Sequence, residues 1–232
     1  QLIARRVRAA QVYCEIHPYN LGLEKIRAFR PRGIILSGGP SSIYDPGAPL
    51  ADRSVLDLAV PVLGICYGMQ YLAHVLRGVV EKAQDREYGS ALVTIEDDRD
   101  LFHGFRKGQS EMVWMSHGDR IDRMPEGFVT LAGSKNSPVA AMADPSRRLF
   151  GVQFHPEVAH TPNGIRILRN FLFRICRCEP LWTMSSFVER TIRDMKERIG
   201  PERVICGISG GVDSSITAVL LHKAVGPQLS CI

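Results

Sequence analysis

The sequence predicts an α/β fold, with a mostly parallel open sheet, helices on both of its faces and antiparallel additions. Short apolar runs at residues 33–37 and 61–65 alternate with segments of helical periodicity, which is the pattern of a parallel sheet. Several strand-like runs then follow one another with no helical stretch of any length between them, which favours antiparallel strands. A fresh strand and helix, from residue 203 to about 225, indicate the start of a second α/β domain.

The elements of the first part follow from residue type and spacing. Residues 12–16 have the composition of a strand, and Leu23, Ile26 and Phe29 fall at helical spacing. A helix is predicted over residues 66–76, and it places four apolar side chains on one face: Met69, Leu72, Ala73 and Leu76.

The later elements divide the chain in two. Five strands are predicted in the middle, at residues 92–95, 111–116, 128–132, 139–143 and 149–154. A helix over 164–176 follows, and residues 178–183 have the composition of a linker. Thr183 is expected to cap a helix over 184–199 that ends at Gly200-Pro201. We therefore expect two domains, 1–178 and 179–232, the second of them an N-terminal fragment.

Composition narrows the class of protein. The net charge is +5, but Lys and Arg are interleaved with acidic residues, so a solvated basic surface is favoured over nucleic-acid binding. No apolar run reaches the roughly 18 residues that cross a bilayer, and the first ten residues lack the apolar core of a signal peptide. The six cysteines show no zinc-knuckle spacing, which favours reduced thiols and a cytoplasmic protein. Because there is no initiator Met, we expect the chain to begin in mid-protein.

Cys66 is the candidate nucleophile. It stands in Gly64-Ile65-Cys66-Tyr67-Gly68, between a predicted strand and a predicted helix, which is the pattern of a nucleophile elbow with Cys in place of Ser. Glycines allow the close backbone approach that so tight a turn requires. The helix N-terminus favours thiolate over thiol, and the Tyr67 N–H can donate to a developing oxyanion. A buried Cys in a Gly-rich turn is the alternative.

His155 is the candidate base. It ends the predicted strand at 149–154 and is followed by Pro156 and Glu157. Two residues apart in an extended segment, His155 and Glu157 point the same way, so Glu157 can hold one ring nitrogen while the other faces a thiol. His117, in Ser116-His117-Gly118-Asp119, is the rival base, although its surroundings favour a substrate loop.

Together these motifs resemble the class I (triad) glutamine amidotransferases, in the family's order and over residues 1–178. They are Ser37-Gly38-Gly39-Pro40-Ser41, the elbow with Gln70, and Gln153-Phe154-His155-Pro156-Glu157. The resemblance implies a thioester mechanism. In that mechanism Cys66 attacks the side-chain amide of glutamine, His155 gives the leaving ammonia its proton, and Glu157 orients His155. It implies no cofactor for glutamine hydrolysis and no metal in this domain. It also carries the oxyanion hole and the glutamine pocket onto Gly39, Ser41, Tyr67, Gln70, Ser116, Gly118 and Asp119.

A second motif lies near the C-terminal end and is similar to the PP-loop of ATP pyrophosphatases. It lacks the Gly-Lys-Ser/Thr of a Walker A loop, and a Gly-rich turn with N-cap serines is the alternative. The resemblance implies that ATP phosphates bind the loop and that Asp213 helps to hold Mg²⁺. The loop consists of Ser209, Gly210, Gly211, Val212, Asp213, Ser214 and Ser215.

An amidotransferase followed by a PP-loop resembles synthetases in which ammonia displaces AMP from adenylated xanthosine monophosphate. This implies glutamine, ATP and xanthosine monophosphate as ligands, the last bound mostly outside this chain, and a homodimer at full length. The family's first strand is missing here, which puts the stability of the chain alone in question. Three alternatives remain: the glutaminase of another ATP-dependent amidotransferase, a γ-glutamyl hydrolase or peptidase, and a catalytically silent scaffold. The PP-loop argues against the hydrolase, and the intact triad argues against the scaffold.

Overall fold

The chain divides into two compact units, Gln1–Pro180 and Leu181–Ile232. A computed structural model describes the backbone of all 232 residues and the side chains of residues 1–82 and 87–232. Each unit is described by itself below. No helix in the described part of the chain combines the length and the apolar character that a bilayer crossing needs.

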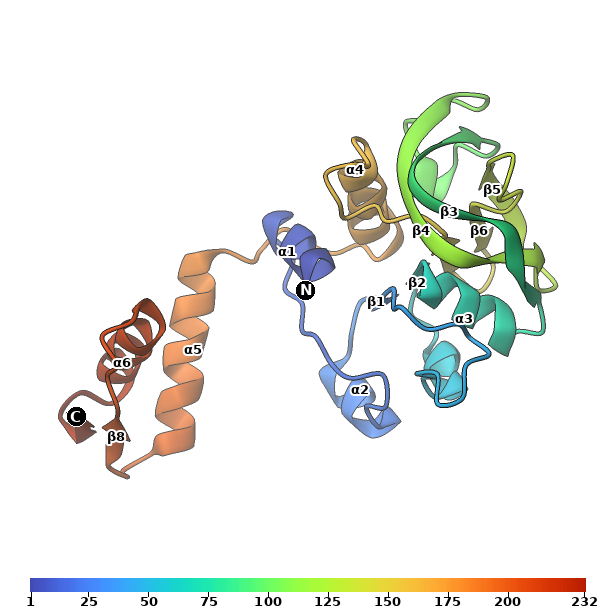
Figure 1. The fold of residues 1–232 in the computed structure, drawn as a ribbon. Helices are drawn as coiled ribbons and strands as arrows, with labels where there is room; N and C mark the ends of the chain where they lie inside the picture. Colours follow the sequence, from blue (N-terminus) through green and yellow to red (C-terminus); the bar gives the residue numbers. More distant parts are fainter. The chain divides into compact units, whose positions relative to one another are not determined.

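Unit 1 is built on a seven-stranded mixed sheet (Figure 1). Its first three strands in spatial order, β1, β2 and β7, are parallel, and the remaining pairings are antiparallel. The spatial order is β1 (Ile34–Leu36), β2 (Val62–Ile65), β7 (Leu149–Val152), β6 (Ala141–Asp144), β5 (Val129–Gly133), β3 (Val79–Ile95) and β4 (Ser110–Arg123).

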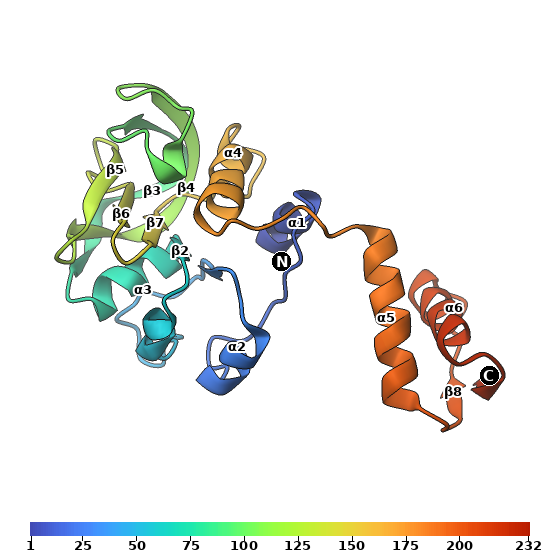
Figure 2. The same ribbon diagram turned by 180° about the vertical axis from the view of Figure 1, so that it is seen from behind.

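Helices cover both faces of the parallel part, as predicted (Figures 1 and 2). Every residue of β2 is buried, because its alternate side chains enter two different cores. Leu63 and Ile65 pack in one core with Ile167 of α4 (Gly164–Arg169). Val62 packs in the other with residues of α3 (Tyr67–Val75), whose Met69, Leu72 and Ala73 are fully buried. The predicted apolar face of this helix is therefore its contact with the sheet.

The antiparallel part is larger than the sequence indicates. Strand β3 begins at Val79 rather than near residue 92, and β4 runs on to Arg123. Side chains along β4 alternate between buried and exposed over most of its length. The sequence predicts a substrate loop after the strand at 111–116, but residues 117–119 continue β4 and pair with β3. The expectation was wrong because the matching partner strand is polar and lacks apolar alternation.

The predicted strand at residues 12–16 is also wrong. These residues form no ladder and follow α1 (Leu2–Ala9) as an irregular segment. Of the five, only Val12 is buried, whereas Tyr13 and Ile16 are exposed, so the run has no apolar face to place on a sheet. Two short helices, α2 (Leu23–Phe29) and η1 (Arg53–Leu58), complete the connections of this part.

The helix predicted over residues 164–176 begins as α4 and continues as a π-helical segment, Asn170–Ile175. The Cys176 N–H donates to the Phe171 carbonyl, five residues back, at 2.8 Å. Asn170 Nδ2 donates to the carbonyls of Leu101 and His103, both at 2.9 Å, and so ties the segment to the short helix Asp100–Phe102.

Unit 2 contains α5 (Met184–Ile199), β8 (Val204–Cys206), α6 (Val212–Val225), the short helix Gly226–Gln228 and β9 (Leu229–Cys231). Strands β8 and β9 are parallel and α6 connects them. Thr183 caps α5 as predicted: its side chain accepts from the Ser186 N–H, and Ser186 Oγ accepts from the Thr183 N–H.

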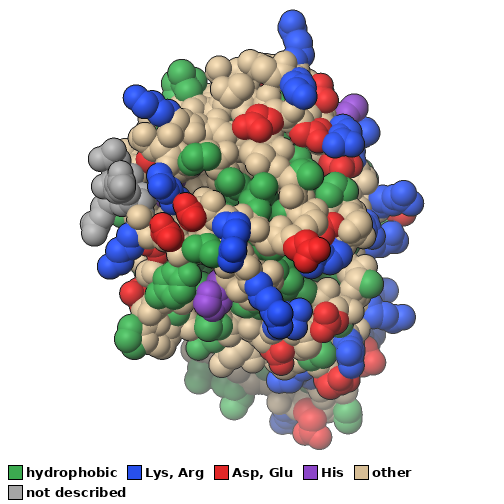
Figure 3. All heavy atoms as spheres, turned by 90° about the vertical axis from the view of Figure 1, so that its right-hand side faces the viewer, with side chains coloured by type: hydrophobic (Ala, Val, Ile, Leu, Met, Phe, Trp, Pro, Cys, Tyr) green, Lys and Arg blue, Asp and Glu red, His purple; other side chains and the backbone are tan. Residues whose placement is uncertain are grey.

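Figure 3 shows one face of the molecule, and on that face basic side chains are interspersed with acidic ones.

Candidate active site

Cys66 occupies a sharp turn between β2 and α3. Its φ is 54° and its ψ is −110°, a backbone conformation that costs a non-glycine residue on the order of 1–3 kcal/mol. The flanking glycines are required by close packing. A Cβ on Gly64 would lie 2.5 Å from the carbonyl carbon of Gly68, and one on Gly68 would lie 2.1 Å from the Leu36 oxygen. The turn therefore holds the thiol at the carboxyl end of β2.

The thiol faces both a helix terminus and a strand. Cys66 is the N-cap of α3, where first-turn N–H groups, including that of Tyr67, have no partner within the helix. Its own N–H donates to the Val152 carbonyl of β7 at 2.8 Å. Cys66 Sγ donates to the Ser116 carbonyl of β4 at 3.6 Å. The nucleophile candidate thus lies where three strands and one helix meet.

His155 and Glu157 lie together beside this thiol. The Nδ1 of His155 is 2.9 Å from Glu157 Oε1. The neighbouring Cys66, and next the Glu157 carboxylate, raises the pKa of His155 to about 10, against the opposing effect of burial. The arrangement therefore holds an imidazolium between a sulfur and a carboxylate at neutral pH.

The backbone around the imidazole is also fixed. The His155 N–H donates to the Trp114 carbonyl at 3.0 Å, and the His155 carbonyl accepts from Thr161 Oγ1 at 2.7 Å. The Glu157 carbonyl accepts from Arg6 Nε of α1 at 2.8 Å. Thr161 and Arg6 were not identified from the sequence, since no local pattern connects them to His155 or Glu157.

His117 does not face the thiol through either ring nitrogen. Its side chain lies on the buried face of β4, where Nδ1 donates to the Asp119 carbonyl at 2.9 Å. Nε2 lies 3.2 Å from Glu87 Oε2, close enough for an ion pair but without hydrogen-bond alignment. Burial lowers the pKa of His117, although Glu87 opposes this. The partners of His117 are therefore Asp119 and Glu87 rather than Cys66.

The alternation of β4 separates the predicted pocket residues. Ser116 and Gly118 share one face of the strand, whereas the Asp119 side chain is buried on the face that carries His117. Asp119 instead meets Gln70 through its backbone, because Gln70 Nε2 donates to the Asp119 carbonyl at 3.0 Å. Gln70 is itself buried on α3.

The glycine-rich loop after β1 borders the same site. A Cβ on Gly38 would lie 3.0 Å from His155 Cε1 and 3.4 Å from Cys66 Cβ, so Gly38 packs directly against the pair. Gly39 is exposed, and a Cβ there would meet only Tyr67 Cγ, at 4.0 Å. The Tyr67 hydroxyl donates to the Pro49 carbonyl at 3.1 Å. Ser41 is half-buried in the same loop.

In unit 2 the predicted phosphate loop begins between β8 and α6, and its last four residues form the first turn of α6. Gly210 has a φ of 80°, and a Cβ there would meet no atom within 4 Å. The hydroxyls of Ser214 and Ser215 donate to the Gly211 carbonyl at 3.0 and 2.9 Å. Ser209 Oγ lies 3.1 Å from Ser214 Oγ. The first-turn N–H groups of α6, at Val212 and Asp213, are therefore presented from an open loop, which fits an anionic phosphate.

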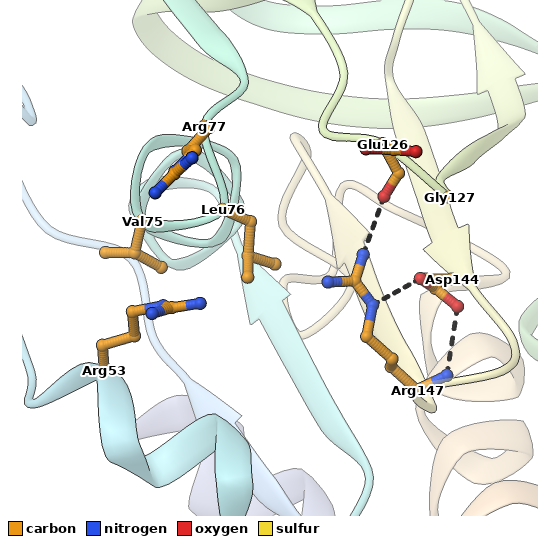
Figure 4. Close-up of a pocket in the computed structure, with 8 residues that line it drawn as sticks. All are labelled: Arg53, Val75, Leu76, Arg77, Glu126, Gly127, Asp144 and Arg147. Carbon is orange, nitrogen blue, oxygen red and sulfur yellow. Dashed lines mark hydrogen bonds and ion pairs between the residues drawn. The ribbon is translucent and has the colours of Figure 1, made fainter.

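A hollow of about 370 Å³ lies elsewhere on unit 1, at the C-terminal end of α3 (Figure 4). Val75 and Leu76 line it together with Arg53 and Arg77. Opposite them, Arg147 Nε donates to Asp144. None of the predicted site residues lines this hollow, and Cys66 stands at the other end of the same helix.

Two family models match the chain, in the order that the motifs indicated. The model for glutamine amidotransferase class-I matches residues 1–175. The chain belongs to this family. A second family model, for NAD synthase, matches residues 184–231 of this amidotransferase chain, where α5, β8 and α6 lie.

Relatives of this amidotransferase carry related names. Proteins named "GMP synthase [glutamine-hydrolyzing]" from Acetivibrio thermocellus and Thermomicrobium roseum are 53% and 56% identical to it. The alignments cover 100% and 99% of this chain but only 45% and 43% of those proteins, so the chain spans less than half their length. The crystal structure of a Thermoplasma acidophilum protein, described as one subunit of a GMP synthase, aligns with a TM-score of 0.69 at 30% identity. It covers 82% of this chain and 90% of that protein.

Proposed function

We propose that this chain is the glutaminase domain, with the beginning of the ATP-binding domain, of a glutamine-hydrolysing GMP synthetase. The observation that carries the proposal is the hydrogen-bonded pair of His155 and Glu157 beside the Cys66 sulfur. The names and the identity of the relatives support the same reaction, a ligation that forms a C–N bond with glutamine as the nitrogen donor.

In the first half of the proposed reaction, Cys66 Sγ attacks the side-chain amide carbon of glutamine. A C–S bond forms, the C–N bond breaks, and the imidazolium of His155 gives its proton to the departing ammonia. A pKa near 10 suits His155 to this role, because the ring already carries the proton at neutral pH. Glu157 keeps the ring oriented through Nδ1 and stabilises its charge.

In the second half, water attacks the thioester carbon, His155 accepts a proton from that water, and glutamate departs as the Cys66 sulfur is regenerated. The oxyanion that develops in each half would accept from the N–H groups of Gly39 and Tyr67. The proposed glutamine pocket comprises Gly39, Ser41, Tyr67, Gln70, Ser116, Gly118 and Asp119. The packing of Gly38 against His155 and Cys66 supports the inclusion of its neighbour Gly39 in this pocket.

The domain assignment is part of the proposal: residues 1–178 form the amidotransferase domain and residues 179–232 begin the ATP pyrophosphatase domain. The structural division after Pro180 and the two family matches support this boundary. Residues 209–215 would hold ATP phosphates, and Asp213 would help to hold Mg²⁺. ATP supplies the adenylation that activates xanthosine monophosphate. A homodimer of the full-length protein is proposed on the family resemblance.

The test uses the full-length protein that carries this chain. With glutamine, ATP, Mg²⁺ and xanthosine monophosphate, the wild type should form GMP. Cys66→Ala should lose glutamine-driven synthesis but keep synthesis from ammonium, because the second site needs only the nitrogen. As a matched control, Cys14→Ala should retain both, since Cys14 lies outside the site. Glutamine hydrolysis without consumption of xanthosine monophosphate would point to another acceptor. Cys66→Ala that keeps glutamine-driven synthesis would refute the triad.

A further inference from the structure

Gln153 is a buried amide to which the triad assigns no role. It follows β7 directly, two residues before His155, and its side chain is fully buried. Its Nε2 lies 3.9 Å from Cys66 Sγ, and its Oε1 lies 3.4 Å from Gln70 Nε2. Burying an amide without hydrogen-bond partners costs free energy, so the two polar contacts of Gln153 offset the cost of its burial.

The direction of this amide follows from its neighbours. A backbone carbonyl can only accept, so the 3.0 Å contact with the Asp119 oxygen makes the Gln70 nitrogen a donor there. The same nitrogen offers its second hydrogen to Gln153, whose oxygen must therefore face Gln70. The nitrogen of Gln153 is left facing the sulfur.

The row of hydrogen bonds from Gln153 through Gln70 ends at the Asp119 carbonyl, which lies in the long antiparallel pair of β3 and β4. His117 Nδ1 donates to the same Asp119 carbonyl at 2.9 Å, so that oxygen accepts two hydrogen bonds. His117 in turn contacts Glu87, whose Oε2 accepts from Ser137 Oγ at 2.6 Å. The carbonyl that sets the direction of Gln70 is thus held in place from the other strand of the ribbon.

The sulfur needs such a donor. In the thiol form, Cys66 donates to the Ser116 carbonyl, but a thiolate has no hydrogen to give, and the carbonyl then presents a partial negative charge to it at 3.6 Å. The compensating groups are the imidazolium of His155, the N-terminus of α3 and the Gln153 amide.

We propose that Gln153 is a hydrogen-bond donor to the Cys66 thiolate, and that Gln70 and the Asp119 carbonyl fix its amide in the donating direction. This rests on the proposed function, in which Cys66 reacts as a thiolate. The role is distinct from that of the glutamine pocket, because Gln70 here acts on the nucleophile through a second amide.

The test is the pH dependence of alkylation of Cys66 by iodoacetamide, followed by mass spectrometry in the full-length protein without glutamine. Gln153→Met keeps the volume but removes the donor, so the midpoint of the rate profile should move roughly 0.5–1 unit toward higher pH. Gln70→Met, which leaves the Gln153 amide unanchored, should move it the same way by less. Gln11→Met changes an exposed glutamine in the same way and should leave the midpoint in place.

The outcomes separate this inference from the proposed function. A wild-type Cys66 that reacts no faster than the other thiols, with or without His155, would overturn the triad and this inference with it. A fast wild-type Cys66 whose midpoint is unchanged in Gln153→Met would overturn this inference alone. Should Gln153→Met fail to fold, Gln70→Met decides the matter: the loss of the anchoring amide should still move the midpoint toward higher pH, and an unchanged midpoint would overturn this inference.

Discussion

Gly68→Ala tests the packing that holds the nucleophile in its turn. A Cβ at this position would lie 2.1 Å from the Leu36 oxygen and 2.7 Å from its carbonyl carbon, whereas ordinary contact begins at 3.4 Å. Both atoms belong to the backbone of β1 and cannot rotate away, so α3 must move off the sheet by about 1.3 Å. We expect a cost near the upper end of the range for overpacking, about 3 kcal/mol.

The expected readouts are thermal and kinetic. For a domain of this size, a loss of about 3 kcal/mol lowers Tm by roughly 6–12 °C. Because α3 carries Cys66 at its N-terminus, a displacement of about 1 Å should also reduce glutamine hydrolysis by about 100-fold. Differential scanning calorimetry and a steady-state glutaminase assay on the same preparation measure both.

Gly22→Ala is the matched control. A Cβ on Gly22 would meet no atom within 4 Å, and its φ is −61°, so the change should cost less than about 1 kcal/mol. If Gly68→Ala melted within 2 °C of the wild type (under about 1 kcal/mol) and kept its glutaminase rate, the close approach of α3 to β1 would be wrong.

The remaining predictions concern the triad and unit 2. Glu157→Gln should reduce steady-state glutamine hydrolysis but leave residual activity, whereas His155→Ala should be nearly inactive; a fully active Glu157→Gln would contradict the assigned roles. The raised pKa of His155 implies stabilisation that is complete below its unfolded value, about 6.5, and is lost as pH rises through about 10. The difference in Tm between wild type and His155→Gln should therefore shrink between those limits, and a difference independent of pH would argue against a charged ring. Thr183→Ala should weaken the first turn of α5 by about 1 kcal/mol, seen as roughly fivefold faster amide exchange there, with no change in α6.

Local signals allowed much of the fold to be predicted. Gly64 and Gly68 mark the elbow because the strand and the helix approach each other too closely for a Cβ at either position. The α5 boundary was predicted to the residue, since Thr183 and Ser186 form a capping box within one turn. Apolar runs predicted β2, whose residues are all buried, and β1, the half-buried edge strand that pairs with it in parallel.

The features that were not predicted depend on contacts between residues that lie far apart in the sequence. Gln153 and Gln70 belong to separate motifs in the sequence, and their contact arises only because β7 pairs with β2. The first half of β3 was missed because its stretch around Lys82 and Glu87 is charged, and its partner residues lie 30 to 44 positions away in β4. The apolar content of residues 12–16 was mistaken for a strand because composition does not report whether a neighbouring strand is available.

The hydrogen-bonding order of the sheet has one more consequence. Strand β4 stands last in that order and β2 stands second, yet the Ser116 carbonyl of β4 lies 3.6 Å from the sulfur that follows β2. A flat sheet would hold these strands more than 20 Å apart, at roughly 4.8 Å per neighbour. The sheet must therefore curl strongly, so that β4 returns to the residue that follows β2. The register shifts of β3, between Val79 and Val80 and between Lys82 and Glu87, sit where such curvature is generated. The position of the Ser116 carbonyl beside Cys66 thus depends on the bend of the β3–β4 ribbon, whose irregular positions lie outside the triad.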